Sequence, residues 1–84
     1  MPEAFIVTVA DSSGRFAADL EIPSRLPFGD FKSKLLEILK ILDNYYFYSW
    51  RDYRLRFNGK PLAADDTLAI VGAFSGSRLI VEKI

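Results

Sequence analysis

The side chains that usually carry out acid–base, nucleophilic or metal chemistry are scarce in this sequence. Its 84 residues include no cysteine and no histidine, so thiolate and imidazole ligands and the commonest general base near neutral pH are all missing. The one pair of adjacent aspartates is Asp65-Asp66, which directly precedes Thr67. Adjacent aspartates in such a position typically cap backbone N–H groups in a turn. We therefore expect a protein that is not an enzyme, with no catalytic residue, no metal site and no cofactor.

The residues best suited to binding a partner lie in one connector. Five of the six residues at positions 45–50 are aromatic, and Tyr and Trp are enriched at the energetic centres of protein interfaces. Candidate partner-binding residues are therefore Tyr45, Tyr46, Tyr48 and Trp50. The same side chains could instead form a lid over the open end of the core, or an extra helical turn. The two roles are compatible, because neighbouring side chains can face opposite ways.

A second candidate surface is charged. Arg54 and Arg56 alternate with apolar residues, which places them on the outer face of a strand. They are candidate contacts of a docking face on which Ile80 and Ile6 would be small apolar spots. The alternative is a solvated sheet face where the arginines pair with Glu82 of a neighbouring strand. Such exposed pairs contribute only about 0.2–1 kcal/mol each.

A sheet must position these side chains, and alternation of apolar residues predicts its strands. Residues 5–10 and 16–22 alternate with a period of two, and the segment between them is a hairpin connection. Residues 53–57 and 79–81 alternate in the same way, and Asn58-Gly59 is a turn signal. The positions expected to face inward are Phe5, Val7, Val9, Phe16, Ala18, Leu20, Ile22, Tyr53, Leu55, Phe57, Leu79 and Val81.

Between the two halves of the chain the period changes to about 3.6, which predicts a helix over residues 28–42. Its apolar side chains fall within an arc of ~100°, the width of a stripe that faces a core. The stripe comprises Phe28, Phe31, Leu35, Ile38, Leu39 and Leu42, while Leu36 and Ile41 flank it and could be core or surface. Leu35, in the middle, should be buried against Val7, Leu55 or Val81. Asp43-Asn44 is the expected end of the helix.

One mixed sheet packed over one main helix buries every apolar face in this order of elements. The expected fold class is therefore α+β, with the β-grasp architecture. The second half of the chain consists of a strand, an Asn-Gly turn, a short segment, a tight turn and a final strand. This order of elements resembles that of ubiquitin-like chains. No repeat, linker or low-complexity tract interrupts the sequence, so we expect residues 1–84 to form a single ubiquitin-like domain.

Composition narrows the range of partners. Lys and Arg together number 11, as do Asp and Glu, so the formal net charge is zero and no basic field favours nucleic acid or anionic lipid. No apolar run approaches the ~20 residues of a membrane-spanning helix, and the first residues lack a signal-peptide pattern. We expect a cytoplasmic protein that binds no nucleic acid and has no membrane span.

Two stretches resemble a known bacterial family. The segment Ala18-Asp-Leu-Glu-Ile-Pro-Ser-Arg-Leu-Pro-Phe-Gly-Asp-Phe31 resembles the strand end and helix start of the YukD-like (EsaB-like) family of small ubiquitin-like proteins. The second half of that family has a leucine, glycine and aspartate pattern that is matched here by Leu55, Gly59, Leu62, Asp66, Leu68, Gly72, Gly76 and Leu79. The resemblance covers nearly the whole chain. Residues 43–53 depart from it, because they are richer in aromatics than the family leads us to expect.

The resemblance implies a non-covalent protein-interaction module that acts as an accessory or regulatory component of a bacterial type VII secretion system. A secretion-channel subunit is one candidate partner, and we expect a monomer or a weak homodimer. Relatives also occur as soluble domains of larger membrane proteins, so an adaptor domain excised from such a protein is an alternative.

Two further classes compete with this interpretation. A protein modifier or sulfur carrier would need a C-terminal Gly-Gly, and the sequence contains no Gly-Gly. A nucleic-acid-binding β-grasp domain would use Arg51, Arg54, Arg56 and Lys60, but the zero net charge counts against it.

Overall fold

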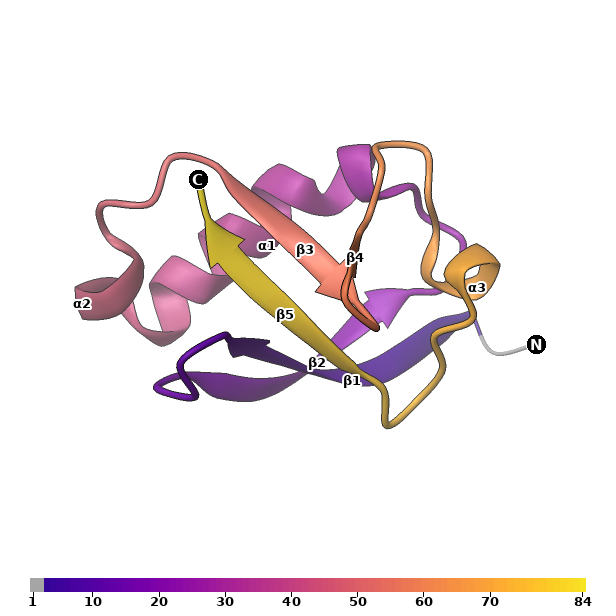
Figure 1. Cartoon of the computed structure of the whole chain (residues 1–84), viewed down its shortest axis with the longest axis horizontal. Coiled ribbons are helices and arrows are strands. Elements are labelled where there is room, and N and C mark those ends of the chain that lie inside the picture. Colours follow the sequence, from indigo (N-terminus) through magenta and orange to yellow (C-terminus); the bar gives the residue numbers. More distant parts are fainter. Residues whose placement is uncertain (1–2) are drawn as a thin grey trace.

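A computed structural model describes residues 3–84, which form a five-stranded sheet with a helix across one of its faces (Figure 1). In chain order the elements are β1 (Ala4–Asp11), β2 (Ala17–Pro23), α1 (Phe28–Leu42), α2 (Asn44–Phe47), β3 (Tyr53–Phe57), β4 (Lys60–Pro61), α3 (Leu68–Val71) and β5 (Arg78–Lys83). The molecule measures 36 × 22 × 22 Å, and the short helices α2 and α3 lie at opposite ends of its long axis.

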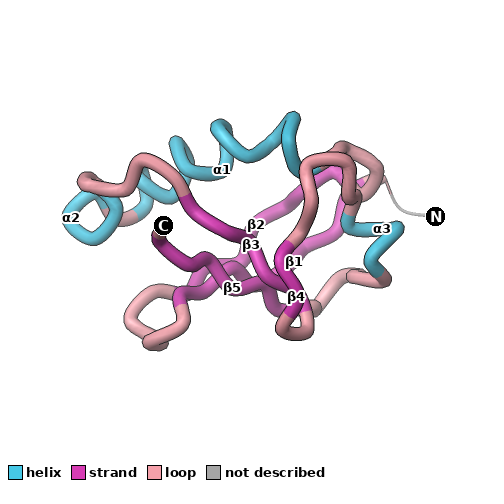
Figure 2. The backbone as a smooth tube through the Cα atoms, turned by 45° about the horizontal axis from the view of Figure 1, so that its top comes forward, coloured by secondary structure: helices cyan, strands magenta, loops and turns pink. Residues whose placement is uncertain are grey.

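The sheet is mixed, with the strand order β2-β1-β5-β3-β4. The neighbouring strands β1 and β5 run parallel, with Val9 opposite Leu79, whereas all other neighbours are antiparallel. Figure 2 shows α1 as a separate layer above the strands. This arrangement confirms the predicted α+β class and the predicted packing of one mixed sheet on one main helix.

The core lies between α1 and the inner face of the sheet, as the alternation predicted. Leu35 is 3% exposed, which confirms that the middle of the helical stripe is buried. The buried apolar side chains of this core are Phe5, Val7, Val9, Phe16, Ile22, Phe28, Phe31, Leu35, Leu39, Phe47, Trp50, Tyr53, Leu55, Leu62, Leu68, Ala73, Leu79 and Val81. Both halves of the sequence therefore contribute to one core.

The predicted stripe is wrong at the C-terminal end of α1. Leu42 is 50% exposed and Ile38 is only partly buried, although both have the expected angular position on the helix. The last turn of α1 lies at the end of the molecule beside α2 (Figure 2). A helical position buries a side chain only where another element lies opposite it. Of the two flanking residues, Leu36 is half-buried and Ile41 is exposed.

The first turn of α1 is capped by a distant loop rather than by a side chain. The helix follows Pro27, which supplies no side-chain hydrogen bond. The N–H groups of Phe28 and Gly29 donate instead to the carbonyl oxygens of Asp66 and Ala64, both at 2.8 Å. Two of the four N–H groups that a helix leaves without an internal partner are satisfied in this way. This contact fixes residues 63–67 against the start of the helix.

The turn between β3 and β4 matches its sequence signal. Asn58 and Gly59 have φ angles of 52° and 80°, the left-handed values that a two-residue hairpin of this type requires. Arg56 pairs with Pro61 and Phe57 with Lys60 across the turn. The Asn58-Gly59 prediction is confirmed.

Candidate functional site

The aromatic connector forms a turn of helix held in place by Asp43. The backbone N–H of Asp43 donates to the Leu39 carbonyl and closes α1, while its carboxylate accepts a hydrogen bond from the Tyr46 amide at 3.1 Å. This second bond caps the N-terminus of α2, as an N-cap aspartate is expected to do. The predicted helix end at Asp43-Asn44 is confirmed, and the extra helical turn that was one alternative for the connector is present as α2.

Two of the five aromatic side chains point into the molecule. Phe47 is fully buried and Trp50 is 5% exposed. Their rings meet edge to face at 4.7 Å, and Phe47 meets Phe16 of the hairpin in the same way at 4.9 Å. Trp50 was a candidate contact residue, but the structure places it in the core, where its large apolar surface closes the end of the sheet. Trp50 is therefore not an accessible contact residue.

Tyr46 is half-buried and is bonded to Asp11. Its hydroxyl donates to the Asp11 carboxylate at 2.6 Å, and the same carboxylate accepts hydrogen bonds from the Phe16 amide at 2.9 Å and from the Ser13 hydroxyl. Burial by itself raises the pKa of Asp11, but the hydrogen bonds from Ser13, Tyr46 and Phe16 outweigh it and hold the pKa below its ordinary value. The hydrogen bond to Asp11 raises the pKa of Tyr46. Tyr46 therefore joins α2 to the β1–β2 hairpin.

Sequence reasoning missed this role of Asp11. The sequence predicts residues 11–14 only as a hairpin connection, and nothing in the local pattern distinguishes a buried aspartate from an exposed turn residue. The partner, Tyr46, lies 35 positions away along the chain.

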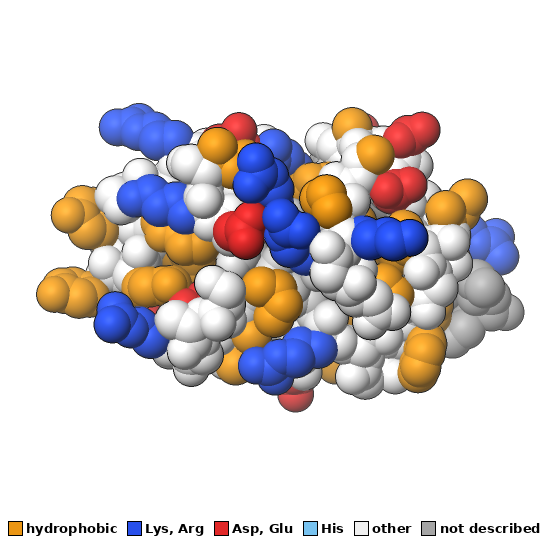
Figure 3. Space-filling view, in the orientation of Figure 1, with side chains coloured by type: hydrophobic (Ala, Val, Ile, Leu, Met, Phe, Trp, Pro, Cys, Tyr) orange, Lys and Arg blue, Asp and Glu red, His pale blue; other side chains and the backbone are white. Residues whose placement is uncertain are grey.

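The other aromatic side chains remain exposed and lie beside apolar residues of α1. Tyr45 is 91% exposed and Tyr48 is 69% exposed, while Ile41 and Leu42 of the last turn of α1 are 76% and 50% exposed. We call these four residues the aromatic end. Figure 3 shows orange side chains at the end of the molecule where Figure 1 places α2. Exposed apolar groups gathered in this way are typical of an interaction surface.

The segment that leads from the aromatic end into β3 is anchored to α1. The Tyr53 hydroxyl donates to the Lys32 carbonyl at 2.7 Å, and the Lys32 ammonium lies 2.6 Å from the Asp52 carboxylate. The hydrogen bond from Lys32 lowers the pKa of Asp52. These contacts with Lys32 therefore hold the end of the connector against α1.

On the outer face of the sheet, the two arginines share one carboxylate. Arg54 Nη1 lies 3.2 Å and Arg56 Nη2 3.3 Å from Glu82 Oε1, and Arg56 also donates to the Gly59 carbonyl at 3.0 Å. The hydrogen bonds from Arg54 and then Arg56 lower the pKa of Glu82. Figure 3 shows a red side chain between blue ones on the face where Figure 1 places β3 and β5. The predicted cross-strand pairing is confirmed, and one positive charge stays uncompensated within the cluster.

The apolar spots expected beside this cluster differ in accessibility. Ile80 is half-buried on β5 opposite Arg56, whereas Ile6 on β1 is 56% exposed. Ile6 lies next to the loop before β5, since its N–H donates to the Ser75 hydroxyl and its carbonyl accepts from Gly76.

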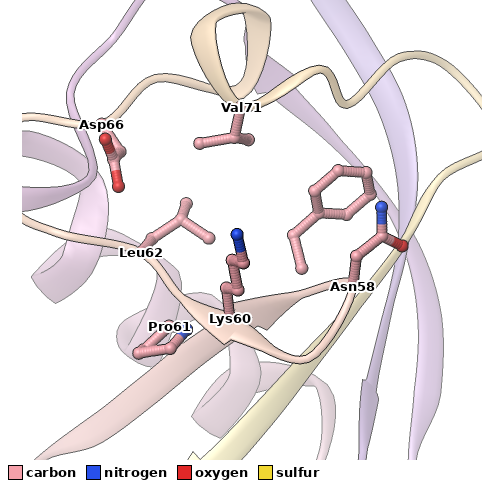
Figure 4. A pocket seen from close by; sticks show the side chains of 7 residues that line it. Asn58, Lys60, Pro61, Leu62, Asp66 and Val71 are labelled. Atoms are coloured by element: carbon pink, nitrogen blue, oxygen red, sulfur yellow. The ribbon is translucent and has the colours of Figure 1, made fainter.

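A hollow of about 360 Å³ lies beside the β3–β4 turn (Figure 4). The Lys60 side chain extends into it between Leu62, Val71 and Asn58. Asp66 lines its edge, but its carboxylate accepts the Ala63 N–H at 2.8 Å, as expected for an aspartate that caps a turn. Within residues 3–84, no three acidic side chains gather in a way that could hold a metal ion.

Comparison with solved structures identifies the fold. The ubiquitin-like domain of the Mycobacterium tuberculosis type VII secretion system protein EccD1 superposes with a TM-score of 0.78 at 22% identity, over 99% of this chain and 100% of that one. The EccD5 ubiquitin-like domain from Mycobacterium xenopi has a TM-score of 0.80 at 17% identity, over 99% and 97% of the two chains. This chain has a ubiquitin-like β-grasp fold.

A third match to the ubiquitin-like fold comes from the MycP5-free ESX-5 inner membrane complex. It has a TM-score of 0.80 at 20% identity and covers 99% of this chain but 21% of that one. The sequence itself matches no protein-family profile and no curated protein at a significant level. Among residues 3–84, no helix has the length and apolar character needed to cross a bilayer.

Proposed function

We propose that this chain is a non-covalent protein-interaction module of a bacterial type VII secretion system and acts at the cytoplasmic side of its membrane complex. The observation that carries the proposal is the full-length likeness to the EccD1 and EccD5 ubiquitin-like domains, with TM-scores of 0.78 and 0.80. The YukD-like motifs in the sequence are a separate line of support for the same secretion system. An accessory protein and a domain of a larger membrane component are both versions of this function.

The aromatic end is the surface through which the module would bind. Tyr45 and Tyr48 offer large, fairly rigid apolar area with a hydroxyl that stays hydrated until binding. Asp43 caps the helical turn that carries them, and the buried Phe47 fixes that turn to the core. Because the backbone of this turn is already fixed, it loses little conformational entropy on association. We infer that a cytosolic segment of a secretion-channel subunit covers this end.

The test is a binding measurement between the purified chain and the cytosolic segments of the membrane subunits from the same organism. Changing Tyr45 and Tyr48 together to serine should weaken association by at least about 2 kcal/mol, or roughly 30-fold, because truncated hot-spot aromatics cost this much. Calorimetric titration gives the dissociation constants, and circular dichroism checks that the double variant is folded.

Phe74→Ser is the matched control, since Phe74 is also exposed, at 64%, and lies in the loop before β5. It should leave the dissociation constant unchanged. Equal affinity of the parent and the double tyrosine variant would contradict the proposed surface. Binding of the parent, but not of the double variant, to anionic lipid vesicles would instead assign the aromatic end to a membrane surface.

A further inference from the structure

The strand β2 leaves one long edge of the sheet open. It pairs with β1 and has no other strand neighbour among residues 3–84, whereas the opposite edge strand, β4, has only two residues. An open edge presents backbone N–H and C=O groups that can pair with a further strand.

The hydrogen-bond pattern shows which residues face this edge. In antiparallel pairs, every second residue bonds to its partner strand. The bonds from the Asp11 N–H to the Phe16 carbonyl and from the Ser24 N–H to the Glu3 carbonyl fix the phase at the two ends of the pair. The even-numbered residues of β2 thus bond to β1. Residues 17, 19 and 21 direct their N–H and C=O groups outward, and Pro23 then ends the row of donors.

A groove accompanies the open edge. It has a volume of about 290 Å³ and lies between β2 and α1, with Ile22, Phe31 and Leu35 contributing apolar surface. Leu26 and Ile38, both half-buried, also line it. The volume is near the low end of the range for small-molecule sites, about 300 Å³, which suits a few side chains better than a cofactor.

The charged side chains of β2 itself, Asp19 and Glu21, are both negative, and an arginine lies beyond each end of the strand, at positions 15 and 25. Asp19 and Glu21 stand on the outer face of β2, where the Asp19 carboxylate accepts a hydrogen bond from Thr8, and Asp30 lines the groove. The one lysine that lines the groove, Lys34, lies 3.6 Å from the Glu37 carboxylate. A positively charged segment is therefore the complementary occupant.

We propose that the β2 edge binds an extended segment of another protein in which basic and apolar residues alternate, so that it adds a sixth strand to the sheet. Its backbone would pair with Ala17, Asp19 and Glu21. Its basic side chains would lie opposite the Asp19 and Glu21 carboxylates, within cross-strand distance. Its apolar side chains, on the other face, would enter the groove beside Leu26 and Ile38.

A second copy of this chain fits the edge less well. Two β2 strands paired side by side would bring the carboxylates of Asp19 and Glu21 together across the new interface, and like charges in cross-strand positions are destabilising. The proposed site is also separate from the aromatic end, and neither proposal depends on the other.

The probe is a synthetic six-residue peptide that alternates lysine and valine, titrated into the isotope-labelled chain and followed by NMR. We expect shift changes confined to β2 and α1, with slower hydrogen exchange at the amides of Ala17, Asp19 and Glu21. A peptide of the same composition with its lysines and valines in separate blocks should bind at least about tenfold more weakly. Only in the alternating peptide do the lysine and valine side chains lie on opposite faces of an extended strand.

Two sets of variants complete the test. Changing Asp19 and Glu21 together to lysine should weaken binding of the lysine–valine peptide about tenfold or more. The same change should strengthen binding of a glutamate–valine peptide. Leu26→Ser should weaken binding, whereas Ile70→Ser, at a residue that is 77% exposed and does not line the groove, should not. If the Leu26→Ser protein does not fold, the effect of the charge reversal on peptide binding still tests the proposal.

Equal affinity for the alternating and blocked peptides, shift changes on β3 and β5, or no effect of the charge reversal would overturn the proposal. Concentration-dependent protection of the β2 amides without peptide would overturn it in favour of a second copy. The Tyr45 and Tyr48 variants should bind the peptide like the parent.

Discussion

Asp11 is the only charged side chain that is buried among residues 3–84. A buried carboxylate is stable only when hydrogen bonds replace the water it has lost. Here the Tyr46 hydroxyl, the Ser13 hydroxyl and the Phe16 amide supply them, from the connector and from the hairpin. At the scale of single residues, this cluster joins the two parts of the chain that close one end of the core.

Replacing Asp11 with alanine should lower the free energy of unfolding by about 1–3 kcal/mol, because the Tyr46 hydroxyl and the Phe16 amide lose their acceptor. Tyr46→Phe removes one donor and keeps the ring, so its cost should be smaller. Urea unfolding of the three proteins measures both effects. An Asp11→Ala protein as stable as the parent would contradict the role of the cluster.

The same cluster makes a prediction about pH. The folded pKa of Asp11 lies below the unfolded value of about 3.9. Its ionised form therefore stabilises the folded state above about pH 4, and this contribution is lost as the pH falls toward the folded pKa. Below pH 4, the stability of the parent should decrease more steeply than that of Asp11→Asn. Parallel stability curves for the two proteins would refute this linkage.

At the scale of elements, α1 supplies one side of the core and is itself fixed at both ends. Backbone carbonyls of Ala64 and Asp66 cap its first turn, and Asp43 ends it. Its middle carries the buried residue Leu35, and its last turn carries the exposed residue Ile41. The middle of α1 therefore contributes to the core, whereas its last turn is exposed to solvent.

Leu35→Ala should destabilise the fold by about 2–5 kcal/mol, because a side chain that is 3% exposed leaves a cavity when it is truncated. Ile41→Ala on the same helix is the matched control, and it should change the stability by no more than about 0.5 kcal/mol. Denaturant unfolding provides both values. A loss below 1 kcal/mol for Leu35→Ala would be incompatible with the observed packing.

At the scale of the whole molecule, positive and negative charges are equal in number but unevenly distributed over the surface. The formal net charge is zero, yet two arginines surround one glutamate on the outer sheet face, and both charged side chains of β2 are carboxylates. Local electrostatic fields of this kind affect the association rate of a partner more than its dissociation rate. The aromatic end adds a third surface at one end of the long axis.

Arg54→Ala and Arg56→Ala should each change the stability by less than about 1 kcal/mol, because the ion pairs with Glu82 remain partly exposed to solvent. For a partner bound at the aromatic end, they should alter the association rate constant and its dependence on salt, with little effect on dissociation. Surface plasmon resonance at several salt concentrations separates the two rates. A change confined to the dissociation rate would show that the arginines lie inside the interface.

The sequence by itself determined the main strands, the main helix and the Asn58-Gly59 turn. These features follow from local rules, since periodicity selects the element and a positive φ selects the turn residues. Tertiary structure alone decided that Trp50 is buried while Tyr45 and Tyr48 are exposed, because five aromatics within six residues show no periodicity that would assign them to a face.

Tertiary structure also exposed Leu42 at the end of α1, buried Asp11 beside Tyr46 and left β2 as an open edge next to a groove. Each of these outcomes depends on which distant segment lies opposite a residue. Local sequence sets the direction in which a side chain points, but only the packed chain sets what it meets there.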